Sequence, residues 1–529
     1  MESHLVSGAA ALEQSTPYLP AEIKSNVARC LIKSNLKTLR CVSKQWHAVS
    51  TPFLFDRLYV SPRDKDLRVF TNLTSHPIMS SAVKEIIYDV SYVPDLSHEE
   101  YFLALCNEVR KVTIWLTDSF NFTDPNPRLN QFVNAVIESG YSFERLFSEY
   151  GNDRLVTEGF QLWQTLVAEE RRNFDDELQG GLFSTLCSGI QRLTNLQTVK
   201  MDGDMWSMNR EHITSSISPL TLYLETSTVP SGSPLARSWN VWHPRPRRPG
   251  YGSGDEAPEN LSLMMRALSG AETSIKHFSY WSSLRNGLSP MVFGRYDITA
   301  SFAFQMCTAL SRLESLQLQI TPQDVDQGES NPLGFLPHLL EQMNGLKGLM
   351  LNLITAQRVE KRRVLSTTPV EDTLYTYSQV FSQRGRWPKL ERLHLSGLAI
   401  AGLDFWFFLN HQVPQLQRLL LNNIDLLEAN WEGAVEAMRY RGAWLPWKMI
   451  SLQQKFRHKG NEWWPCTPKR EEKEWLALQK YSSYIEYGGR HPSLPKDRED
   501  SHSVSYLNEM YYAASRERLE TFHSASSMY

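Results

Sequence analysis

Two stretches of the chain, Trp387–Leu395 (WPKLERLHL) and Val413–Leu421 (VPQLQRLLL), follow the same pattern of leucines. In each stretch a leucine is followed by two residues, a second leucine, one residue and a third leucine. The last two leucines lie on one face of a short strand, because side chains alternate along a strand, and the first closes the preceding turn. Looser copies occur elsewhere: Val83, Ile86, Tyr88; Val109, Val112, Ile114; Leu196, Val199, Met201; Ile275, Phe278, Tyr280; Leu313, Leu316, Leu318; Leu346, Leu349, Leu351. The recurrence predicts a series of short strands with a shared core.

These segments resemble the strands of leucine-rich repeats, in which each unit stacks on the next and all units share one core. Segments with helical periodicity lie between them: Gln131–Ser139, Phe160–Glu170, Leu263–Leu268, Gly334–Met343 and Tyr375–Arg384. The spacing is irregular, and Leu398 and Ile424 stand where the repeat usually has asparagine. The resemblance implies mixed α and β structure, with an irregular leucine-rich-repeat-like α/β solenoid of parallel strands over residues 57–440. An unrelated α/β fold is the alternative.

The N-terminal stretch Pro17–Phe55 reads PYLPAEIKSNVARCLIKSNLKTLRCVSKQWHAVSTPFLF and is rich in apolar residues at helical spacing. Pro20 suits the first position of a helix that ends near Ile32. One stripe of that helix carries Ile23, Val27 and Leu31. A stretch this short buries little surface, so its apolar stripe predicts contact with another protein.

Two further helices are expected in the same stretch. Ser34 is predicted to cap the second helix, which carries Leu36 and Leu39. Val42 and Trp46 continue the apolar spacing into a third, which we expect to end at Thr51-Pro52, because a residue before proline is disfavoured in the α region.

The stretch resembles the F-box, the helical module that binds a Skp-type adaptor in cullin–RING ubiquitin ligases. The segments that carry the resemblance are Leu19-Pro20-x-Glu22-Ile23, Leu36-x-x-Leu39-Arg40-x-Val42-Ser43-Lys44-x-Trp46 and Phe53-Leu54-Phe55. The continuations Asp56–Ser61 and Thr74–Pro77 resemble the fungal branch of F-box proteins. The resemblance implies an F-box at residues 17–56 and a non-catalytic substrate receptor. The adaptor-binding residues that it implies are Leu19, Pro20, Ile23, Val27, Leu31, Leu36, Leu39, Val42, Trp46 and Leu54. An N-terminal helical cap packed on its own chain is the alternative.

The strand pattern also predicts a target-binding face. The middle residue of each L-x-L segment points away from the leucines on either side of it. These residues are Gln317, Met350, His394 and Leu420, a mixed polar and apolar row suited to an unidentified target protein.

Composition narrows the classes of partner. The 529 residues are 41% hydrophobic and 21% charged, with a formal charge of −3, which gives no reason to expect nucleic acid or a membrane surface as the main partner. The apolar run Leu398–Leu409 is far shorter than the ~20 residues that a membrane-spanning helix needs. The six scattered cysteines favour a reducing compartment. We expect a soluble intracellular protein, cytoplasmic and/or nuclear.

The remaining regions receive simpler interpretations. Residues 1–16 are expected to form a flexible N-terminus, and residues 226–259, rich in proline and glycine, an exposed loop. Residues 441–529 are expected to form a cap and tail, with Trp447 among the tryptophans that pack on the last repeat. The sequence holds no recognised catalytic, cofactor-binding or metal-ligating motif. A leucine-rich-repeat interaction scaffold that acts without a cullin is the alternative function, and an enzyme is a more distant one.

Overall fold

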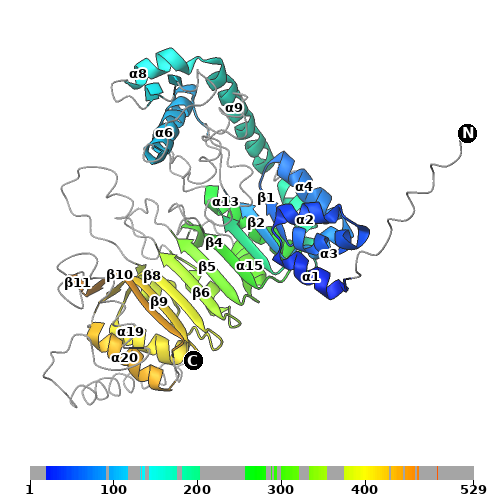
Figure 1. Cartoon of the computed structure of the whole chain (residues 1–529). Helices are drawn as coiled ribbons and strands as arrows, with labels where there is room; N and C mark the ends of the chain where they lie inside the picture. The colour runs from blue at the N-terminus through cyan, green and yellow to red at the C-terminus, as the bar shows by residue number, and fades with distance from the viewer. Residues whose placement is uncertain are drawn as a thin grey trace, which may run out of the picture.

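A single large β-sheet organises the chain (Figure 1). The computed structural model describes residues 19–90, 95–116, 131–132, 134–136, 142–175, 181–202, 256–281, 288, 291–294, 300–320, 333–353, 375–427, 431–444, 447–458, 461–463 and 485. Within these ranges the sheet has eleven strands, of which β1 to β10 are parallel and β11 is antiparallel to β10. The expected mixed α/β fold with a parallel sheet is therefore confirmed.

The spatial order of the strands follows the order of the chain. The sheet runs β1-β2-β3-β4-β5-β6-β8-β9-β10-β11, and the short β7 pairs with β8. The strands are β1 Arg57–Val60, β2 Glu85–Asp89, β3 Thr198–Asp202, β4 His277–Trp281, β5 Ser315–Ile320, β6 Gly348–Leu353, β7 Tyr375–Thr376, β8 Arg392–Ile400, β9 Arg418–Leu426, β10 Met449–His458 and β11 Asn461–Trp463. Every predicted L-x-x-L-x-L segment except one ends in a strand.

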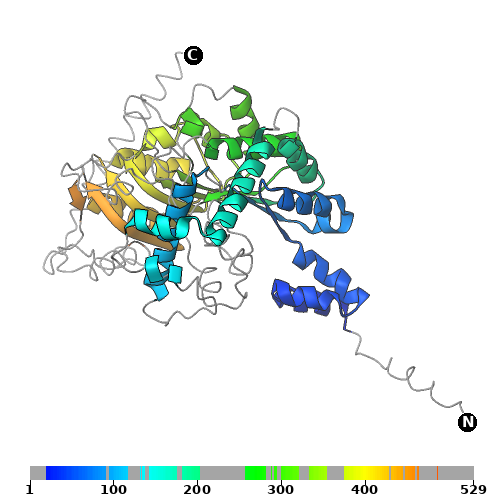
Figure 2. The same ribbon diagram turned by 90° about the horizontal axis from the view of Figure 1, so that it is seen from above.

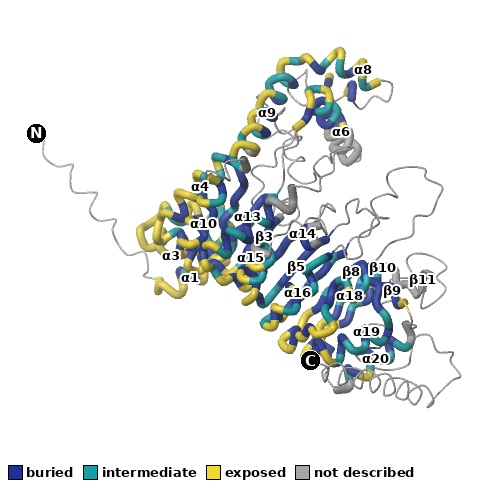
Figure 3. Tube along the Cα trace, turned by 180° about the vertical axis from the view of Figure 1, so that it is seen from behind, coloured by how far each residue is buried: buried dark blue, intermediate teal, exposed yellow. Residues whose placement is uncertain are grey.

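Helices line one face of the sheet, and the opposite face points toward the viewer in Figure 1 (Figures 1, 2 and 3). The α-helices are α1 Ala21–Cys30, α2 Lys33–Arg40, α3 Lys44–Leu54, α4 Asp64–Ser75, α5 Pro77–Ala82, α6 His98–Leu116, α8 Phe143–Leu146, α9 Arg154–Asp175, α10 Gly181–Gln191, α13 Glu256–Gly270, α14 Met291–Gly294, α15 Ala300–Leu310, α16 Leu336–Glu341, α18 Tyr377–Val380, α19 Gly402–Phe407 and α20 Trp431–Trp444. In the part of the chain that the structure describes, the π-helical turns η1 Phe147–Gly151 and η3 Phe408–Gln412 follow α8 and α19. Helices α10, α13, α15, α16 and α18 contact one another in chain order.

The core lies between the sheet and these helices. Along β6 the side chains of Leu349, Leu351 and Leu353 are buried, whereas Met350 and Asn352 are partly exposed. The same alternation occurs at the starts of β5, β8 and β9. Because the strands are in register, the buried positions join into one hydrophobic cluster that runs from β1 to β10.

One strand prediction is wrong. Val109, Val112 and Ile114 lie in helix α6, because their spacing also fits a helix.

A capping box begins helix α6: the Ser97 hydroxyl accepts a hydrogen bond from the Glu100 amide (3.2 Å), and the Glu100 carboxylate accepts one from the Ser97 amide (2.9 Å).

Helices α6, α8 and α9 form a lobe between β2 and β3 with a second hydrophobic core (Figure 1). Tyr101, Phe102 and Trp163 are among its fully or almost fully buried residues. The interior is rich in aromatic contacts, for example Tyr101 with Trp163 at 5.8 Å between ring centres. We refer to residues 98–175 as the helical lobe.

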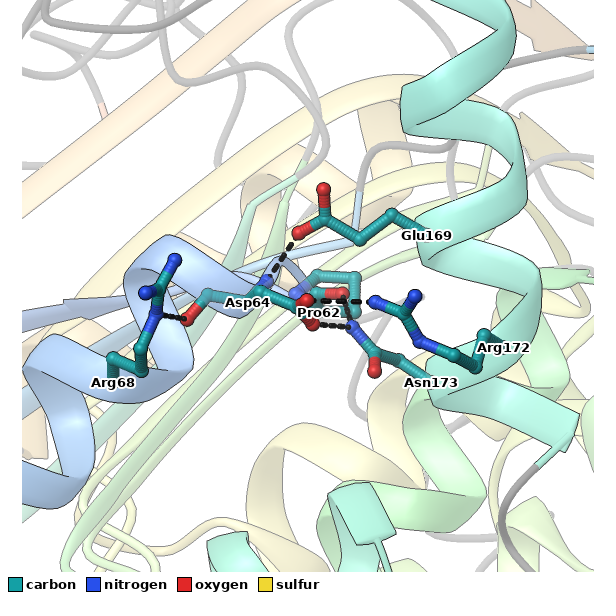
Figure 4. A network of polar contacts seen from close by, with 6 residues as sticks. All are labelled: Pro62, Asp64, Arg68, Glu169, Arg172 and Asn173. Carbon is teal, nitrogen blue, oxygen red and sulfur yellow. Dashed lines mark hydrogen bonds and ion pairs between the residues drawn. The ribbon is translucent and has the colours of Figure 1, made fainter.

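Polar contacts tie the helical lobe to the start of α4 (Figure 4). Glu169 of α9 accepts a hydrogen bond from the Asp64 amide, one of the amides at the α4 N-terminus that lack a partner inside the helix. Arg172 pairs with the Asp64 carboxylate at 2.6 Å, and Asn173 donates to the Pro62 carbonyl at 2.9 Å and to Asp64 at 3.0 Å. A carboxylate therefore caps α4 from another helix, which fixes the C-terminal half of α9 against the N-terminus of α4.

The structure also bears on the expected boundaries. The parallel sheet continues past residue 440 into β10, and Trp447 is buried in the main core. Residues 256–259, expected in the exposed loop, begin helix α13, and residues 226–255 lie outside the described residues, as do residues 1–16. No helix among the described residues has the length and apolar character required to span a membrane.

Candidate functional site

The N-terminal helices α1, α2 and α3 form a small unit that we call the three-helix module. Its own core is limited to Ala28, Leu36 and Leu54, with Leu31, Val49, Phe53 and Phe55 packed partly buried against them. Much of the module surface is exposed (Figure 3). So small a core leaves apolar side chains of the module in contact with solvent.

Helix α1 has two distinct long faces. Lys24 and Ala28 face inward and are buried, and the Lys24 ammonium donates to Gln45 and lies 5.9 Å from the centre of the Trp46 ring. An adjacent face, one residue round the helix, carries Ile23 and Val27, exposed by 46% and 41%. Together with the exposed Leu19 before the helix, they form a row of the i, i+4, i+8 type, which we call the α1 stripe.

Lys24 of helix α1 is not a surface lysine. Its aliphatic stem is packed, and its charge lies over an indole ring. The residues that do face solvent are the apolar ones. Burial of α1 through Ala28 and Lys24 leaves the α1 stripe without a partner among the described residues.

The other adaptor-binding candidates divide by burial. Pro20 and Val42 are exposed, whereas Leu31, Leu39 and Trp46 are partly buried. Leu36 and Leu54 are buried in the module's own core, so they support its fold and cannot contact a partner directly.

Two predicted helix ends of the module are wrong. Ser34 lies inside α2, which begins at Lys33 after the extended Ile32. Helix α3 does not end at Thr51-Pro52 but continues through Pro52 to Leu54, which places Leu54 in the core. Its N-cap is Ser43, whose hydroxyl accepts a hydrogen bond from the Trp46 amide at 3.3 Å.

A short connection joins the three-helix module to the sheet. Only Phe55 and Asp56 separate the end of α3 from β1. The Lys33 ammonium pairs with Asp56 and donates to the Leu54 carbonyl at 2.8 Å. The module and the first strand are therefore held together by covalent, ionic and hydrogen-bond links.

The candidate target-binding residues lie in one row across the sheet. Gln317 of β5 is in register with Met350 of β6, Met350 with His394 of β8, and His394 with Leu420 of β9. All four side chains are partly exposed, and the leucines on either side of each are buried. We call this set the central row; the face that carries it is not the one covered by helices α13, α15 and α16 (Figure 3).

His394 gives the central row a polar centre. Burial lowers the pKa of its imidazole below the ordinary value of 6.5, so the ring is neutral at pH 7. Its Nε2 atom has no hydrogen-bond partner and is inaccessible to solvent. A neutral imidazole flanked by Met350 and Leu420 makes this part of the row suited to a mixed apolar and polar contact.

A second row on the same face carries charge. At the beginning of the sheet Glu85 of β2 pairs with Arg57 of β1 at 3.4 Å and with Lys200 of β3 at 2.8 Å. A separate group is made of residues that each directly precede a strand, one position before the residues in register with Glu85. In this group Glu314 pairs with Lys347 at 2.9 Å and with Lys276 at 3.6 Å, and the hydrogen bond from Lys347 is the main cause that lowers the pKa of Glu314. In both groups one carboxylate lies between two basic side chains.

The described residues show no group of three or more histidine, cysteine, aspartate or glutamate side chains that could hold a metal ion. The features with functional potential are thus surfaces: the α1 stripe and the rows of the sheet face. The sequence matches none of the models of known protein families, and no curated protein matches it significantly.

Proposed function

We propose that the chain is the substrate-recognition subunit of a Skp–cullin–F-box ubiquitin ligase. The three-helix module would be the F-box and bind a Skp-type adaptor, which in turn binds a cullin. The parallel sheet and its helices would be an irregular leucine-rich-repeat-like solenoid that binds a target protein. The chain itself would be non-catalytic and act in the cytoplasm and/or nucleus.

The observation that carries this proposal is the α1 stripe. It lies on the segment whose sequence resembles the F-box, and it is exposed although it is apolar. Interfaces of standard size bury ~1,200–2,000 Å² and concentrate their binding energy in a few apolar anchors. Leu19, Ile23 and Val27 are suited to be such anchors.

The sheet face supports the second half of the proposal. The central row offers side chains at the ~4.8 Å spacing of neighbouring strands, and its mixture of apolar and polar groups is typical of a protein-binding surface. The two-residue connection after α3 would hold this face at a set position relative to the adaptor. Ubiquitin transfer would then be favoured by proximity, because target lysines are kept at high effective concentration.

The test is capture of a purified Skp-type adaptor by the full chain, with Val27→Asp as the variant. Val27 is not part of the module core, so the variant should remain folded while it buries an unpaired charge in the complex. We expect affinity for the adaptor to fall at least thirtyfold, which corresponds to about 2 kcal/mol. Circular dichroism and the melting temperature verify that the fold is retained.

The matched control is Leu162→Asp in the helical lobe. Leu162 is 42% exposed and Val27 41%, so both substitutions introduce the same charge at an equally exposed apolar position. The control should bind the adaptor as the wild type does. If the wild type does not bind the adaptor, or if Val27→Asp binds it equally well, the chain is better described as an interaction scaffold that acts without a cullin.

A further inference from the structure

On the sheet face that carries the central row, the charged side chains at the starts of β8 and β9 are both basic. Arg392 of β8 and Arg418 of β9 occupy the first position of their strands, are in register with each other and are both exposed. Neighbouring strands are ~4.8 Å apart, so two guanidinium groups start from adjacent points on one face. Like charges directly opposite each other destabilise a sheet.

No carboxylate of the described residues forms an ion pair with either guanidinium. Glu391 is next in sequence to Arg392 and exposed, yet it pairs with neither arginine. This contrasts with the Arg57–Glu85–Lys200 and Lys276–Glu314–Lys347 groups, where a carboxylate lies between the basic side chains. The end of the row at β8 and β9 therefore carries uncompensated positive charge, although the whole chain has a formal charge of −3.

A glycine in β6 leaves room for the side chain of Arg392. Gly348 of β6 is in register with Arg392, and a Cβ atom at Gly348 would lie 3.4 Å from Nη2 and 3.5 Å from Nε of that arginine. The guanidinium therefore extends across the glycine toward β5. Glycine at this position leaves the guanidinium room to lie along the surface.

Apolar side chains border the two arginines. Met449 of β10 is in register with Arg418 and 42% exposed. Leu420 and Met350 of the central row lie two residues further along their strands than Arg418 and Gly348, on the same face. Each of the two guanidinium groups can bind a carboxylate through two parallel hydrogen bonds. The surface therefore combines two carboxylate-binding groups with neighbouring flexible apolar side chains.

We infer that Arg392 and Arg418 form the docking site for an acidic segment of a protein partner, in which carboxylates lie next to an apolar side chain. The inference rests on the proposed role of the sheet face in target binding. It is independent of the α1 stripe and of the adaptor, and therefore it can succeed or fail separately.

The test measures fluorescence anisotropy of a labelled peptide in which glutamate alternates with leucine, titrated with the full chain. We expect binding that weakens at high salt, and at least about tenfold weaker binding for Arg392→Gln and for Arg418→Gln. A peptide with glutamine in place of glutamate should bind much more weakly. Both variants should keep the melting temperature of the wild type, since neither side chain is in the core.

Lys200→Gln is the matched control, because it removes one positive charge from the same face at a position already paired with Glu85. It should bind the acidic peptide within about twofold of the wild type. The inference is overturned if the acidic peptide does not bind, if the control loses as much affinity as the arginine variants, or if a single-stranded oligonucleotide binds more tightly with the same dependence on Arg392 and Arg418. If the acidic peptide does not bind but the Skp-type adaptor does, the proposed ligase role stands and the target is not an acidic segment.

Discussion

Arg441 of helix α20 lies over the ring of Trp447, with 4.5 Å between the guanidinium carbon and the ring centre. The arginine is buried and donates to the carbonyls of Val413 (3.0 Å), Pro414 (3.3 Å) and Leu416 (3.0 Å), which precede β9. Its burial lowers its pKa to about 10. One side chain thus satisfies the carbonyls of the turn before β9 and holds α20 to the end of the sheet.

Replacement of this arginine should destabilise the C-terminal end of the sheet. Arg441→Met keeps much of the apolar stem but removes the donor of three hydrogen bonds, although the Val413 carbonyl still accepts from the Leu416 amide (3.1 Å). The free energy of unfolding should therefore fall by about 2–4 kcal/mol. Arg441→Lys should cost less, because the ammonium keeps the charge and loses the planar fork. Chemical denaturation measures both, with the exposed Lys448→Met as control. Equal stability of Arg441→Met and the wild type would contradict the role of the three hydrogen bonds.

Gly397 is a position in β8 where only glycine fits. Its φ is +77°, and a Cβ atom there would lie 1.8 Å from the Leu353 carbonyl oxygen of β6. Gly397→Ala must therefore move backbone, and we expect a loss of at least about 3 kcal/mol in unfolding free energy. Gly345→Ala is the control, because its nearest neighbour would lie at 3.4 Å and no unusual φ is required. A melting temperature of Gly397→Ala close to that of Gly345→Ala would refute the strain argument.

Glu169 should hold the helical lobe against α4. Glu169→Ala removes the acceptor of the Asp64 amide, so this amide should exchange its hydrogen faster and α9 should be cleaved more readily near its C-terminal end. Glu158→Ala, on the same helix, removes only an exposed pair with Arg154 and should change neither observable. Hydrogen exchange followed by mass spectrometry distinguishes the two variants. Unchanged exchange of α4 in Glu169→Ala would show that the cap is not needed.

Acid should destabilise the protein partly through His394. The folded-state pKa of this histidine is below its unfolded value of 6.5, because burial disfavours the charged ring. As pH falls through 6.5 the unfolded chain therefore binds a proton that the folded chain does not, and the free energy of unfolding decreases. His394→Gln should make stability less dependent on pH between 7 and the lower folded-state pKa. An unchanged pH profile for His394→Gln would exclude this histidine as a source of acid sensitivity.

The repeated strands could be predicted from sequence because strand periodicity is a local property. In Leu393-His394-Leu395 and Leu419-Leu420-Leu421 the alternation of faces decides which side chains are buried, and the observed burial follows it. Val109, Val112 and Ile114 were misassigned because three apolar residues at that spacing also fit a helix, and the aromatic partners that stabilise α6 come from distant segments.

Long-range pairs account for most of what sequence did not reveal. Nothing near Lys24 indicates that Gln45 and Trp46 will surround it, so its burial could not be read from α1 alone. Pro52 was expected to end α3, but the helix continues past it and Leu54 packs in the module core. The contrast between the paired Lys200 and the unpaired Arg392 likewise depends on register between strands that are distant in sequence.

The position of the helical lobe has a consequence for how the chain folds. Strands β2 and β3 are direct neighbours, yet the whole lobe lies between Asp89 and Thr198. Closing a connection of this length costs conformational entropy before any hydrogen bond of the pair can form. The lobe could fold early on its own aromatic core and then bind α4 through Glu169 and Asn173. The connection between β2 and β3 would then contain fewer unstructured residues when the two strands pair. The rate at which β3 joins β2 would then depend on the lobe, so that mutations in its interior should slow refolding of a sheet that they do not touch.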